Sequence, residues 1–508
     1  MHGMKNHICL LAAAAATVFS AMPPASAAVK FASPFADGMV LQRDARVAVW
    51  GTADPAEKVT VSFAGQTAVA TADAEGRWLA RLKPMSASKE GRVLRANDAK
   101  VEDVLVGEVW FCCGQSNTEL PLVGGSPHFR DREGLLLSAI TNLKFVRCVY
   151  ASDYKWSVRP RMKAAYPVKW RAFTPENLGK GPSFSAMGVY FAIALYNALD
   201  VPVGIVGSYW GGTNIDAWTP REGYDGAPES LRYTSDYPVV EAGKWTADCK
   251  KGPIGSAHQQ PTVLWNEMVA PWCPMAMRGF IWYQGCHNAG AGEAQNYCDK
   301  MHALYRGWAK KFENPDLKLY FVQLAPFSCS WWDIQLQQAK FAAEEKNAGM
   351  VVSADIGNNS DIHPADKGPL GRRLAALALN RDYGFAGLVA DSPVCRSART
   401  EGDTLVLSFD HADGWYVYNA DWSTNVPFEV AGDDGAFKPA VLVNLKKGAK
   451  RPNGSIAKPT GVVEGADLVL RAEGVAVPKK ARYLYNRPWN GNVFAKSGLP
   501  LGPFVFGD

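Results

Sequence analysis

Five short apolar runs lie in the middle of the chain, and helix-like stretches separate some of them. Runs of this length and composition are typical of strands that are buried on both faces, as in a parallel sheet covered by helices. The helix-like stretches cover residues 185–199 and 333–347. The pattern predicts an α/β fold with a parallel sheet. The runs are DVLVGEVWFC (103–112), PVGIVG (202–207), RGFIWY (278–283), KLYFVQL (318–324) and GMVVSAD (349–355).

The segments on either side of this region have a different pattern. Residues 29–103 and the segment from 386 onward contain short alternating stretches, such as EKVTVSFAG and ADLVLRAEG, punctuated by Gly, Asp and Pro. Alternation of this kind indicates antiparallel β-structure, and a small sandwich is expected at the N-terminal side. A chain of 508 residues is also too long for one compact core. We therefore expect a β domain at 28–103, an α/β domain at 104–385 and a β-rich region at 386–508.

The first 27 residues have the pattern of a cleaved leader. Lys5 supplies a positive charge, residues 8–21 are apolar but too few to span a bilayer, and Ala25-Ser26-Ala27 fits a cleavage site. No later stretch is long and apolar enough to predict a transmembrane helix. The mature protein is therefore expected to be exported, either periplasmic or secreted. A formal charge of +5 is small for this length and predicts no nucleic-acid or membrane-surface partner.

The cysteines give little guidance on their own. Removal of the leader leaves nine of the ten, so at least one is unpaired or pairs between chains. Cys286, His287, Cys298 and His302 loosely suggest a metal site, but adjacent side chains such as the first two do not usually converge on one ion. Scattered structural residues are the favoured interpretation.

Small polar residues follow the ends of four predicted central strands. The segments are GQSN (114–117), SYWGGTNIDAW (208–218), QGCHN (284–288) and IGNNSDIHPADK (356–367). Ligands of open parallel sheets bind beyond the carboxyl ends of the strands. Together these segments offer a hydroxyl, an imidazole, a carboxylate, and backbone and amide N–H groups, which are the groups that an acyl-transfer site needs.

Each of these residues also has a purely structural interpretation. Ser116 could cap a helix, Gly211 and Gly212 could form a plain turn, Asn288 could be a cap, and His363 could be a surface histidine. Their joint placement at successive strand ends favours a catalytic site. The sequence contains no G-x-S-x-G elbow, no P-loop and no H-E-x-x-H motif, so the chemistries of those motifs are disfavoured.

Several motifs resemble those of one enzyme family. GQSN (114–117), GGTNIDAW (211–218), WYQGCHN (282–288) and DIHPADK (361–367) look like the blocks of SGNH-type esterases, and their spacing is most similar to the sialate O-acetylesterase family. DGMVLQRD (37–44), VGEVW (106–110) and GLPLGPF (498–504) resemble that family as well, so the likeness extends over nearly the whole mature chain. The resemblance implies an SGNH-like, flavodoxin-like sheet with flanking β domains.

The resemblance also implies roles for individual residues. Ser116 would be the nucleophile, and His363 would be the general base and then the acid. The N–H groups of Ser116 and Gly212 and the Asn288 amide would form the oxyanion hole. The reaction would need no metal or organic cofactor, and the substrate would be an O-acetylated sialic acid or a related acetylated glycan. Residues expected to contact substrate are Gln115, Trp210 and Gln284.

The partner that orients His363 is left open by the sequence. Many SGNH enzymes have an aspartate three residues before the histidine, where this chain has Ser360. Asp361, two residues before His363, is favoured, because residues two apart in an extended stretch project to the same side. Asp355, expected at the end of the last central strand, is the second candidate. A Ser–His dyad with a backbone carbonyl as the orienting group is the third.

The expected function is that of an exported carbohydrate esterase with a serine nucleophile. An acetylxylan or other polysaccharide acetylesterase is one alternative, and a sugar-binding protein on a decayed hydrolase scaffold is another. The joint presence of Ser116, Asn288 and His363 argues against decay. Relatives usually have an acidic residue at the position of Cys286 and Met at that of Thr118, which leaves the substrate preference open. Cys113 and Cys286 are expected not to be nucleophiles, because the serine and histidine blocks already supply a mechanism.

Overall fold

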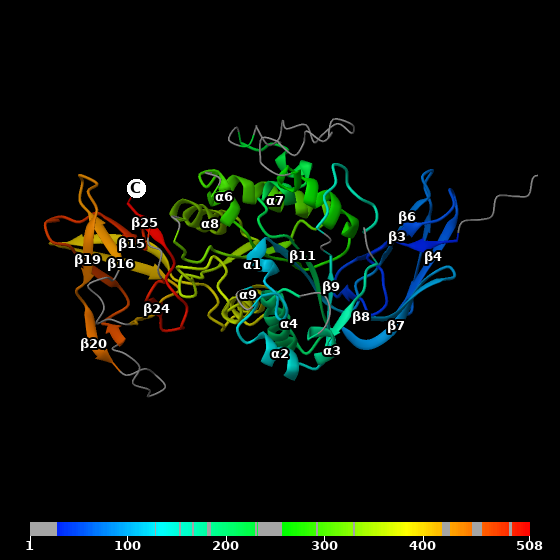
Figure 1. The fold of residues 1–508 in the computed structure, drawn as a ribbon, viewed down its shortest axis with the longest axis horizontal. Coiled ribbons are helices and arrows are strands. Elements are labelled where there is room, and N and C mark those ends of the chain that lie inside the picture. Colours follow the sequence, from blue (N-terminus) through cyan, green and yellow to red (C-terminus); the bar gives the residue numbers. More distant parts are fainter. Residues whose placement is uncertain are drawn as a thin grey trace, which may run out of the picture.

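Three blocks of structure lie in a row in the protein, which is described here from a computed structural model (Figure 1). The central block contains helices and a parallel sheet, and a β-structure flanks it on each side. The expected leader of residues 1–27 lies outside the described residues. The structure describes residues 28–126, 129–151, 154–164, 167–179, 184–228, 231, 257–290, 293–328, 331–418, 427–449, 460–486 and 490–507.

The central sheet confirms the predicted parallel arrangement. Among the described residues, all neighbouring pairs from β9 to β14 are parallel, and the edge strand β10 is antiparallel to β9. Every residue of β11 and β12 is buried, as expected for strands that are covered on both faces. In spatial order the strands are β10 (Arg171–Phe173), β9 (Leu143–Tyr150), β11 (Val203–Tyr209), β8 (Ala99–Gly114), β12 (Gly279–Tyr283), β13 (Lys318–Val322) and β14 (Ala348–Val351).

Four longer helices cover the sheet. In Figure 1, α4 and α9 lie on one side of it and α7 and α8 on the other. The predicted helices at 185–199 and 333–347 are confirmed as α4 and α8 within a few residues. Ser185 caps the start of α4 by accepting a hydrogen bond from the Gly188 N–H at 3.2 Å. The helices are α4 (Ala186–Leu199), α7 (Tyr297–Lys311), α8 (Trp332–Glu344) and α9 (Gly368–Asp382).

Short helices occupy several of the connections. The single-turn helix that directly follows β8 begins at the candidate nucleophile. The short α-helices are α1 (Ser116–Glu119), α2 (Gly134–Ile140), α3 (Pro175–Leu178) and α6 (Cys286–Gly290). Tighter or wider helical turns are η1 (Asp216–Trp218), η2 (Arg221–Tyr224), η5 (Ala257–Gln259), η6 (Trp265–Val269) and η7 (Ala270–Trp272).

The N-terminal strands are antiparallel, as predicted, with one exception. β2 runs parallel to β8, so that β8 pairs with N-terminal strands along its first half and with β11 and β12 along its second half. The boundary expected between residues 103 and 104 therefore falls inside β8. The N-terminal strands are β1 (Lys30–Phe31), β2 (Val40–Gln42), β3 (Val47–Thr52), β4 (Lys58–Phe63), β5 (Gln66–Thr71), β6 (Arg77–Leu82) and β7 (Ser88–Ala96).

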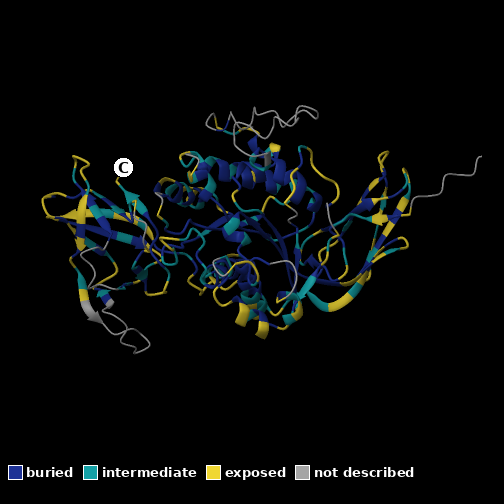
Figure 2. Cartoon of the chain, viewed as in Figure 1, coloured by how far each residue is buried: buried dark blue, intermediate teal, exposed yellow. Residues whose placement is uncertain are grey.

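The C-terminal strands form two antiparallel sheets around a second hydrophobic core, which also includes Val352 and Ala354 from the segment after β14. The N-terminal strands share the core of the central sheet. Figure 2 shows the buried strands of the central block and the exposed residues that concentrate on the outer flanks. One sheet contains β15 (Val394–Glu401), β16 (Thr404–Asp410), β22 (Leu468–Arg471), β19 (Lys438–Leu442), β18 (Phe428–Ala431), β23 (Lys480–Tyr483) and β25 (Phe504–Phe506). The other contains β20 (Leu445–Ala449), β21 (Thr460–Val463), β17 (Trp415–Val417) and β24 (Val493–Ala495).

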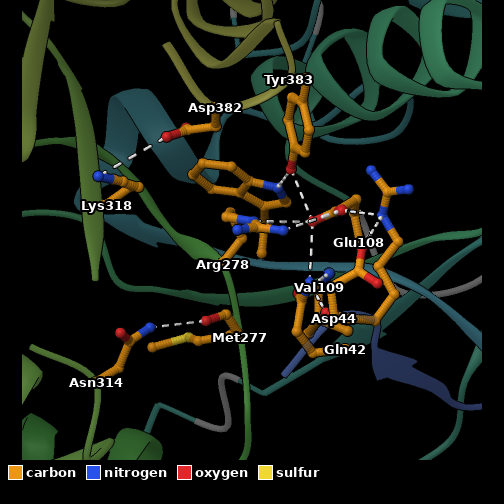
Figure 3. A network of polar contacts seen from close by, with 12 residues as sticks. Gln42, Asp44, Glu108, Val109, Met277, Arg278, Asn314, Lys318, Asp382 and Tyr383 are labelled. Atoms are coloured by element: carbon orange, nitrogen blue, oxygen red, sulfur yellow. Dashed lines mark hydrogen bonds and ion pairs between the residues drawn. The ribbon is translucent and has the colours of Figure 1, made fainter. Parts of the chain in front are cut away.

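A buried carboxylate in β8 joins the N-terminal strands to the central sheet (Figure 3). Glu108 is fully buried and accepts hydrogen bonds from Gln42 at 3.1 Å and from the Tyr383 hydroxyl at 2.8 Å. It also pairs with Arg43 and, at 3.3 Å, with Arg278. Burial alone would raise the pKa of Glu108, but Arg278 and Arg43 outweigh burial and hold the pKa below its ordinary value. The charged form is therefore the one that the fold stabilises.

We predict that Glu108→Gln lowers the thermal midpoint, because Arg43 and Arg278 lose the buried carboxylate that both of them bind. Arg43 keeps only a longer contact with Asp44, at 3.6 Å. Loss of one partner of a fully buried pair costs about 3–5 kcal/mol. We expect a smaller cost here, because the Arg43 and Arg278 side chains keep 22% and 30% of their exposure. Since the pKa of folded Glu108 is depressed, its contribution is present at neutral pH and is lost as the pH falls through that pKa. The difference in thermal midpoint between the wild type and Glu108→Gln should therefore become smaller at acidic pH.

Glu102→Gln is the matched control, because Glu102 lies in the same strand but forms an exposed pair with Lys100. Exposed pairs contribute at most about 1 kcal/mol, so the control midpoint should stay close to that of the wild type. Thermal unfolding followed by circular dichroism measures both. Equal midpoints for the two variants would contradict the proposed importance of Glu108.

Candidate active site

The loops that follow β8, β11 and β12 meet at one point of the sheet. β8 lies between β11 and β12. The strands β9, β10 and β11, which follow β8 in sequence, lie on one side of it, and β12, β13 and β14 lie on the other side. Such a reversal of strand order is where open α/β sheets bind ligands. Trp210 N–H donates to the Gly114 carbonyl at 3.1 Å, and Gln115 N–H donates to the Tyr283 carbonyl at 3.2 Å. Both neighbouring loops therefore contact the turn that carries Ser116.

Ser116 and His363 lie within hydrogen-bonding distance, as a serine nucleophile and its base require. Ser116 Oγ is 2.9 Å from His363 Nε2, although 247 residues separate them in sequence. Ser116 begins α1 and is partly exposed, so a substrate can reach its hydroxyl. The ring of Phe129 packs edge-on against the His363 ring, with centroids 4.9 Å apart. The imidazole is therefore held from the side while Nε2 faces the serine.

The residues next to Ser116 explain why this strand ends in a cluster of polar side chains. Gln115 Oε1 accepts hydrogen bonds from the N–H groups of Gly285 at 3.2 Å and His287 at 3.3 Å. Asn117 Nδ2 donates to the Ile362 carbonyl at 3.0 Å. One side chain thus binds the loop after β12, and the other binds the segment that carries His363. Ser116 therefore lies between two side-chain amides, and each of them fixes a neighbouring segment of the chain.

The structure separates the two aspartates that could orient His363. Asp361 Oδ1 accepts a hydrogen bond from the His363 backbone N–H at 2.8 Å and lies 3.6 Å from Nδ1 of the ring. The 3.6 Å distance between Asp361 Oδ1 and His363 Nδ1 is too long for a hydrogen bond, but contacts of this length can shorten when substrate binds. Asp355 instead forms two hydrogen bonds with Arg373, at 2.8 and 2.6 Å. β14 ends at Val351, so the prediction that Asp355 ends this strand is wrong.

The two remaining oxyanion candidates lie on the flanking loops. Gly212 is exposed and has φ +70°, a left-handed conformation that favours glycine, and a Cβ there would meet no atom within 4 Å. Asn288 is fully buried. Its Oδ1 accepts from Gln284 Nε2 at 2.8 Å and from Ile215 N–H at 3.1 Å. Its Nδ2 donates to Glu293 at 2.8 Å, and the second hydrogen of this amide is the one that an oxyanion role would use.

The three expected substrate contacts differ in their exposure. Gln115 and Gln284 are 3% and 0% exposed, and their side chains hydrogen-bond to the protein itself. This placement argues against direct substrate contact and gives both amides a structural role. Trp210 is only partly buried and stacks on His258 with centroids 4.7 Å apart and an interplanar angle of 11°. The Tyr154 ring packs edge-on against the Trp210 ring.

Comparison with known proteins decides the family. Residues 106–380, more than half of the chain, match the family of sialic acid-specific acetylesterases among the carbohydrate esterases. The chain belongs to this family. A solved carbohydrate acetylesterase from Xanthomonas citri superimposes with a TM-score of 0.76 at 31% identity, covering 94% of this chain and all of that one. The chain is thus a carboxylic ester hydrolase with an α/β fold, as the resemblance implied.

Curated members of this acetylesterase family are also similar in sequence. A human sialate O-acetylesterase is 29% identical over 406 residues, which cover 72% of this chain and 73% of the relative. A mouse sialate O-acetylesterase is 26% identical over 454 residues, which cover 79% of this chain and 82% of the relative. The similarity therefore extends well beyond the central sheet.

Two polar residues near Ser116 were missed at the level of sequence. Lys367 is fully buried, donates to Asn117 Oδ1 at 2.6 Å, and lies over the Tyr283 ring. Burial lowers the pKa of Lys367 to about 7. Glu119, in the last position of α1, accepts a hydrogen bond from Gly211 N–H at 2.6 Å and another from the Tyr154 hydroxyl. Both residues belong to stretches that were already singled out, but only the fold shows that they face the site.

The cysteines near the site have the surroundings of structural residues. Cys113 is fully buried, and burial raises the pKa of its thiol well above the ordinary value. Such a thiol is a poor nucleophile. Cys286 is also buried, and Asn117 Nδ2 lies 3.9 Å from its sulfur.

We predict that Asp361→Asn lowers kcat much more than Asp355→Asn. Loss of the carboxylate that orients the base can cost up to about 10⁴-fold in kcat, and we expect at least about tenfold here. Asp355→Asn should instead lower the thermal midpoint, because its partner Arg373 is mostly buried. Steady-state kinetics and thermal unfolding of both variants measure the contrast. A large loss of kcat only in Asp355→Asn would exclude Asp361, and small losses in both would favour a dyad.

A second prediction concerns the pH dependence of kcat/KM. Burial lowers the pKa of His363, the charge of Lys367 lowers it further, and Asp361 acts in the opposite direction. A general base must be neutral, so activity should fall as the pH drops through this pKa. Lys367→Gln removes the positive neighbour and should move the acid limb to higher pH. Asp361→Asn removes the negative neighbour and should move the acid limb to lower pH.

The control for these shifts is Lys310→Gln, because Lys310 forms an exposed pair with Asp225. Its pH profile should match that of the wild type. Profiles of kcat/KM on an uncharged aryl acetate keep titration of the substrate out of the measurement. Shifts of the same sign in Lys367→Gln and Asp361→Asn would contradict the roles that we assign to the two charges.

Proposed function

We propose that this protein hydrolyses O-acetyl esters of carbohydrates through an acetyl-enzyme on Ser116. The single observation that carries the proposal is the 2.9 Å contact between Ser116 Oγ and His363 Nε2 at the point where the strand order reverses. Family membership supports the ester chemistry, and the solved relative named as a carbohydrate acetylesterase supports the substrate class. The SGNH-type arrangement is part of the proposal, with residues 104–385 as the catalytic domain between flanking β domains.

The first half of the proposed reaction acylates the serine. His363 Nε2 takes the proton from Ser116 as the oxygen attacks the acetyl carbonyl carbon. The carbonyl oxygen becomes negative and is stabilised by the N–H groups of Ser116 and Gly212 and the Asn288 amide. When this intermediate collapses, the bond to the sugar oxygen breaks, and that oxygen takes the proton from His363. The sugar leaves with a free hydroxyl, and the acetyl group stays on Ser116.

The second half of the reaction releases acetate. His363 removes a proton from a water molecule, and the resulting oxygen attacks the acetyl carbon of the acyl-enzyme. The same N–H groups stabilise the second oxyanion. Collapse of this intermediate breaks the bond to Ser116, which regains its proton from His363. Throughout both halves Asp361 stabilises the positive charge on the imidazole, and no metal or organic cofactor takes part.

We further propose O-acetylated sialic acid as the preferred substrate. The name of the matching family and the names of the human and mouse relatives support this choice. Trp210 lies on the loop after β11, is only partly buried, and has His258 stacked on its ring and Tyr154 packed edge-on against it. Aromatic side chains of this kind can pack against the apolar part of a sugar. We also propose export to the periplasm or the medium, on the basis of the expected leader. Among the described residues, no helix combines the length and the apolar composition needed to cross a bilayer.

An acetylated plant or host polysaccharide is the second candidate substrate. Glu119 places a carboxylate beside the loop that carries Trp210, which favours a neutral sugar over an anionic one. The third alternative is a sugar-binding protein without activity, and the short contact between Ser116 and His363 argues against it.

The test measures acetate release by wild type and Ser116→Ala from O-acetylated sialosides, acetylated xylan and an aryl acetate. The wild type should act on all three to some extent, with the highest kcat/KM on the sialosides. Ser116→Ala should lose several orders of magnitude in kcat, because no nucleophile remains. Ser360→Ala, which changes an exposed serine three residues before His363, is the control and should stay active.

Three results would change the proposal. A folded Ser116→Ala protein with near-normal turnover would exclude the acetyl-enzyme. Higher kcat/KM on acetylated xylan than on the sialosides would replace the preferred substrate. Absence of acetate release from every substrate, with retained binding to the deacetylated sugars, would favour the sugar-binding alternative.

A further inference from the structure

Helices α7 and α8 lie side by side on one face of the central sheet (Figure 1). Cys298 and His302 are four residues apart on α7, so they project from the same side of this helix. Glu344 is the last residue of α8. Its Oε2 atom lies 3.4 Å from Cys298 Sγ and 3.0 Å from His302 Nε2. A thiol, an imidazole and a carboxylate therefore converge on one point between the helices.

We propose that Cys298, His302 and Glu344 form a binding site for a divalent transition-metal ion, with Zn²⁺ as the expected metal. The three ligand atoms all lie within 4.8 Å of one another. In tetrahedral zinc sites the bonds are about 2.0–2.3 Å long, so neighbouring ligand atoms lie about 3.3–3.5 Å apart. The two observed separations differ from that range by a few tenths of an ångström at most. The third separation, between Cys298 Sγ and His302 Nε2, is at most 4.8 Å. These two side chains therefore have to move toward one another by up to about 1.3 Å to place all three atoms around one ion.

The types of ligand identify the class of ion. A sulfur and an imidazole nitrogen suit zinc and its neighbours, whereas Mg²⁺ and Ca²⁺ prefer oxygen alone. Binding replaces the hydrogen of the Cys298 thiol by the metal and releases that proton to solvent. The Cys298 side chain is buried, while His302 and Glu344 keep 21% and 45% of their exposure. A metal ion can therefore reach the site from solvent, and water can fill the fourth position.

The surrounding residues hold two of the ligands in place. Phe341 packs edge-on against the His302 ring, with centroids 4.8 Å apart. Lys340 lies 3.9 Å from the other carboxylate oxygen of Glu344, Oε1, which leaves Oε2 directed at the sulfur and the imidazole. Such neighbours orient metal ligands and contribute to affinity. Cys286 and His287, which the sequence grouped with Cys298 and His302, do not belong to this cluster.

The expected effect of the metal is to fix α7 to α8. Lys300, two residues from Cys298, donates to Asp216 at 2.8 Å and to Glu293 at 2.6 Å. Glu293 in turn accepts from the Asn288 amide. The metal site shares no residue with the Ser116–His363 pair, and the contacts of Lys300 and Glu293 do not involve the three ligands. The metal-free protein should therefore keep its esterase activity. Bound metal should raise the thermal midpoint by at least about 2 °C, because it binds the folded state alone.

The experiment uses the full chain after treatment with a chelator and desalting. Co²⁺ titration should produce an intense thiolate-to-cobalt absorption band that saturates at one equivalent, and Zn²⁺ should abolish this band by displacement. Cys298→Ser should lose the band and the metal-dependent rise in thermal midpoint. His302→Gln and Glu344→Gln should keep the fold and bind Zn²⁺ at least about tenfold more weakly. Cys395→Ser is the matched control, because Cys395 is a half-buried thiol in the C-terminal strands.

Three outcomes would overturn the proposal. The wild type could show no thiolate band and no rise in midpoint with either metal. Cys298→Ser could bind as tightly as the wild type, or Cys395→Ser could lose the band equally. If Cys298→Ser does not fold, the two variants at the exposed ligands decide, and unchanged Zn²⁺ affinity in both would exclude the site. None of these results depends on the substrate or on the activity of Ser116.

Discussion

The buried charge of Glu108 is the interaction on which the relative placement of three elements depends. Arg43 follows β2, Arg278 precedes β12, and Tyr383 follows α9, and all three side chains reach the same carboxylate. A charge in this position is tolerable only because its partners are complete. Since Glu108 lies in β8, the network fixes the start of the strand segment whose other end carries Ser116. The ionic network around Glu108 therefore contributes to the position of Ser116 from the other end of this strand segment.

At the other end of β8, the polar residues work as a set. Residues 115–119 each contact a different part of the surroundings: the loop after β12, His363, the backbone at Ile362, the end of β12 and the loop after β11. A strand that ended in apolar residues could not hold three loops through directed bonds. The cluster of polar groups therefore brings His363 and the loops after β11 and β12, from distant parts of the sequence, to Ser116.

Much of the fold was predictable, because strands covered on both faces leave a clear signal. The apolar runs and the helices between them correspond to β8, β11, β12, β13, α4 and α8. The convergence of Ser116 and His363 was also predictable, because strand ends in a parallel sheet lie at one edge. Residues 99–102 at the start of β8 were not recognised as part of the same strand. They include the charged residues Lys100 and Glu102, and this stretch pairs with the antiparallel N-terminal strand β7.

The roles of side chains in the site were harder to predict, since a motif does not show where its members point. Gln284 belongs to the same block as Asn288, yet its amide is used inside the protein. Asp355 and Asp361 are both acidic residues before His363, and only the fold shows that Arg373 binds the first. In the sequence Lys367 looks like a surface lysine, but in the fold it is buried between the start of α9 and the end of β12. The Cys298 cluster needs the packing of two helices, which sequence spacing does not supply.

The continuity of β8 bears on how this architecture can change over evolution. One uninterrupted strand of 16 residues belongs to the N-terminal sheet at its start and to the parallel sheet at its end. Loss of the segment before it would leave a row of unpaired backbone N–H and C=O groups along half of β8, an edge that invites aggregation. Among the described residues, the C-terminal strands pair with no strand of the parallel sheet, although their core includes Val352 and Ala354 from the segment after β14. Loss of the C-terminal strands would therefore expose apolar side chains but no edge of the parallel sheet, whereas the N-terminal strands β2, β4, β5 and β7 form one sheet with the strand that leads to Ser116.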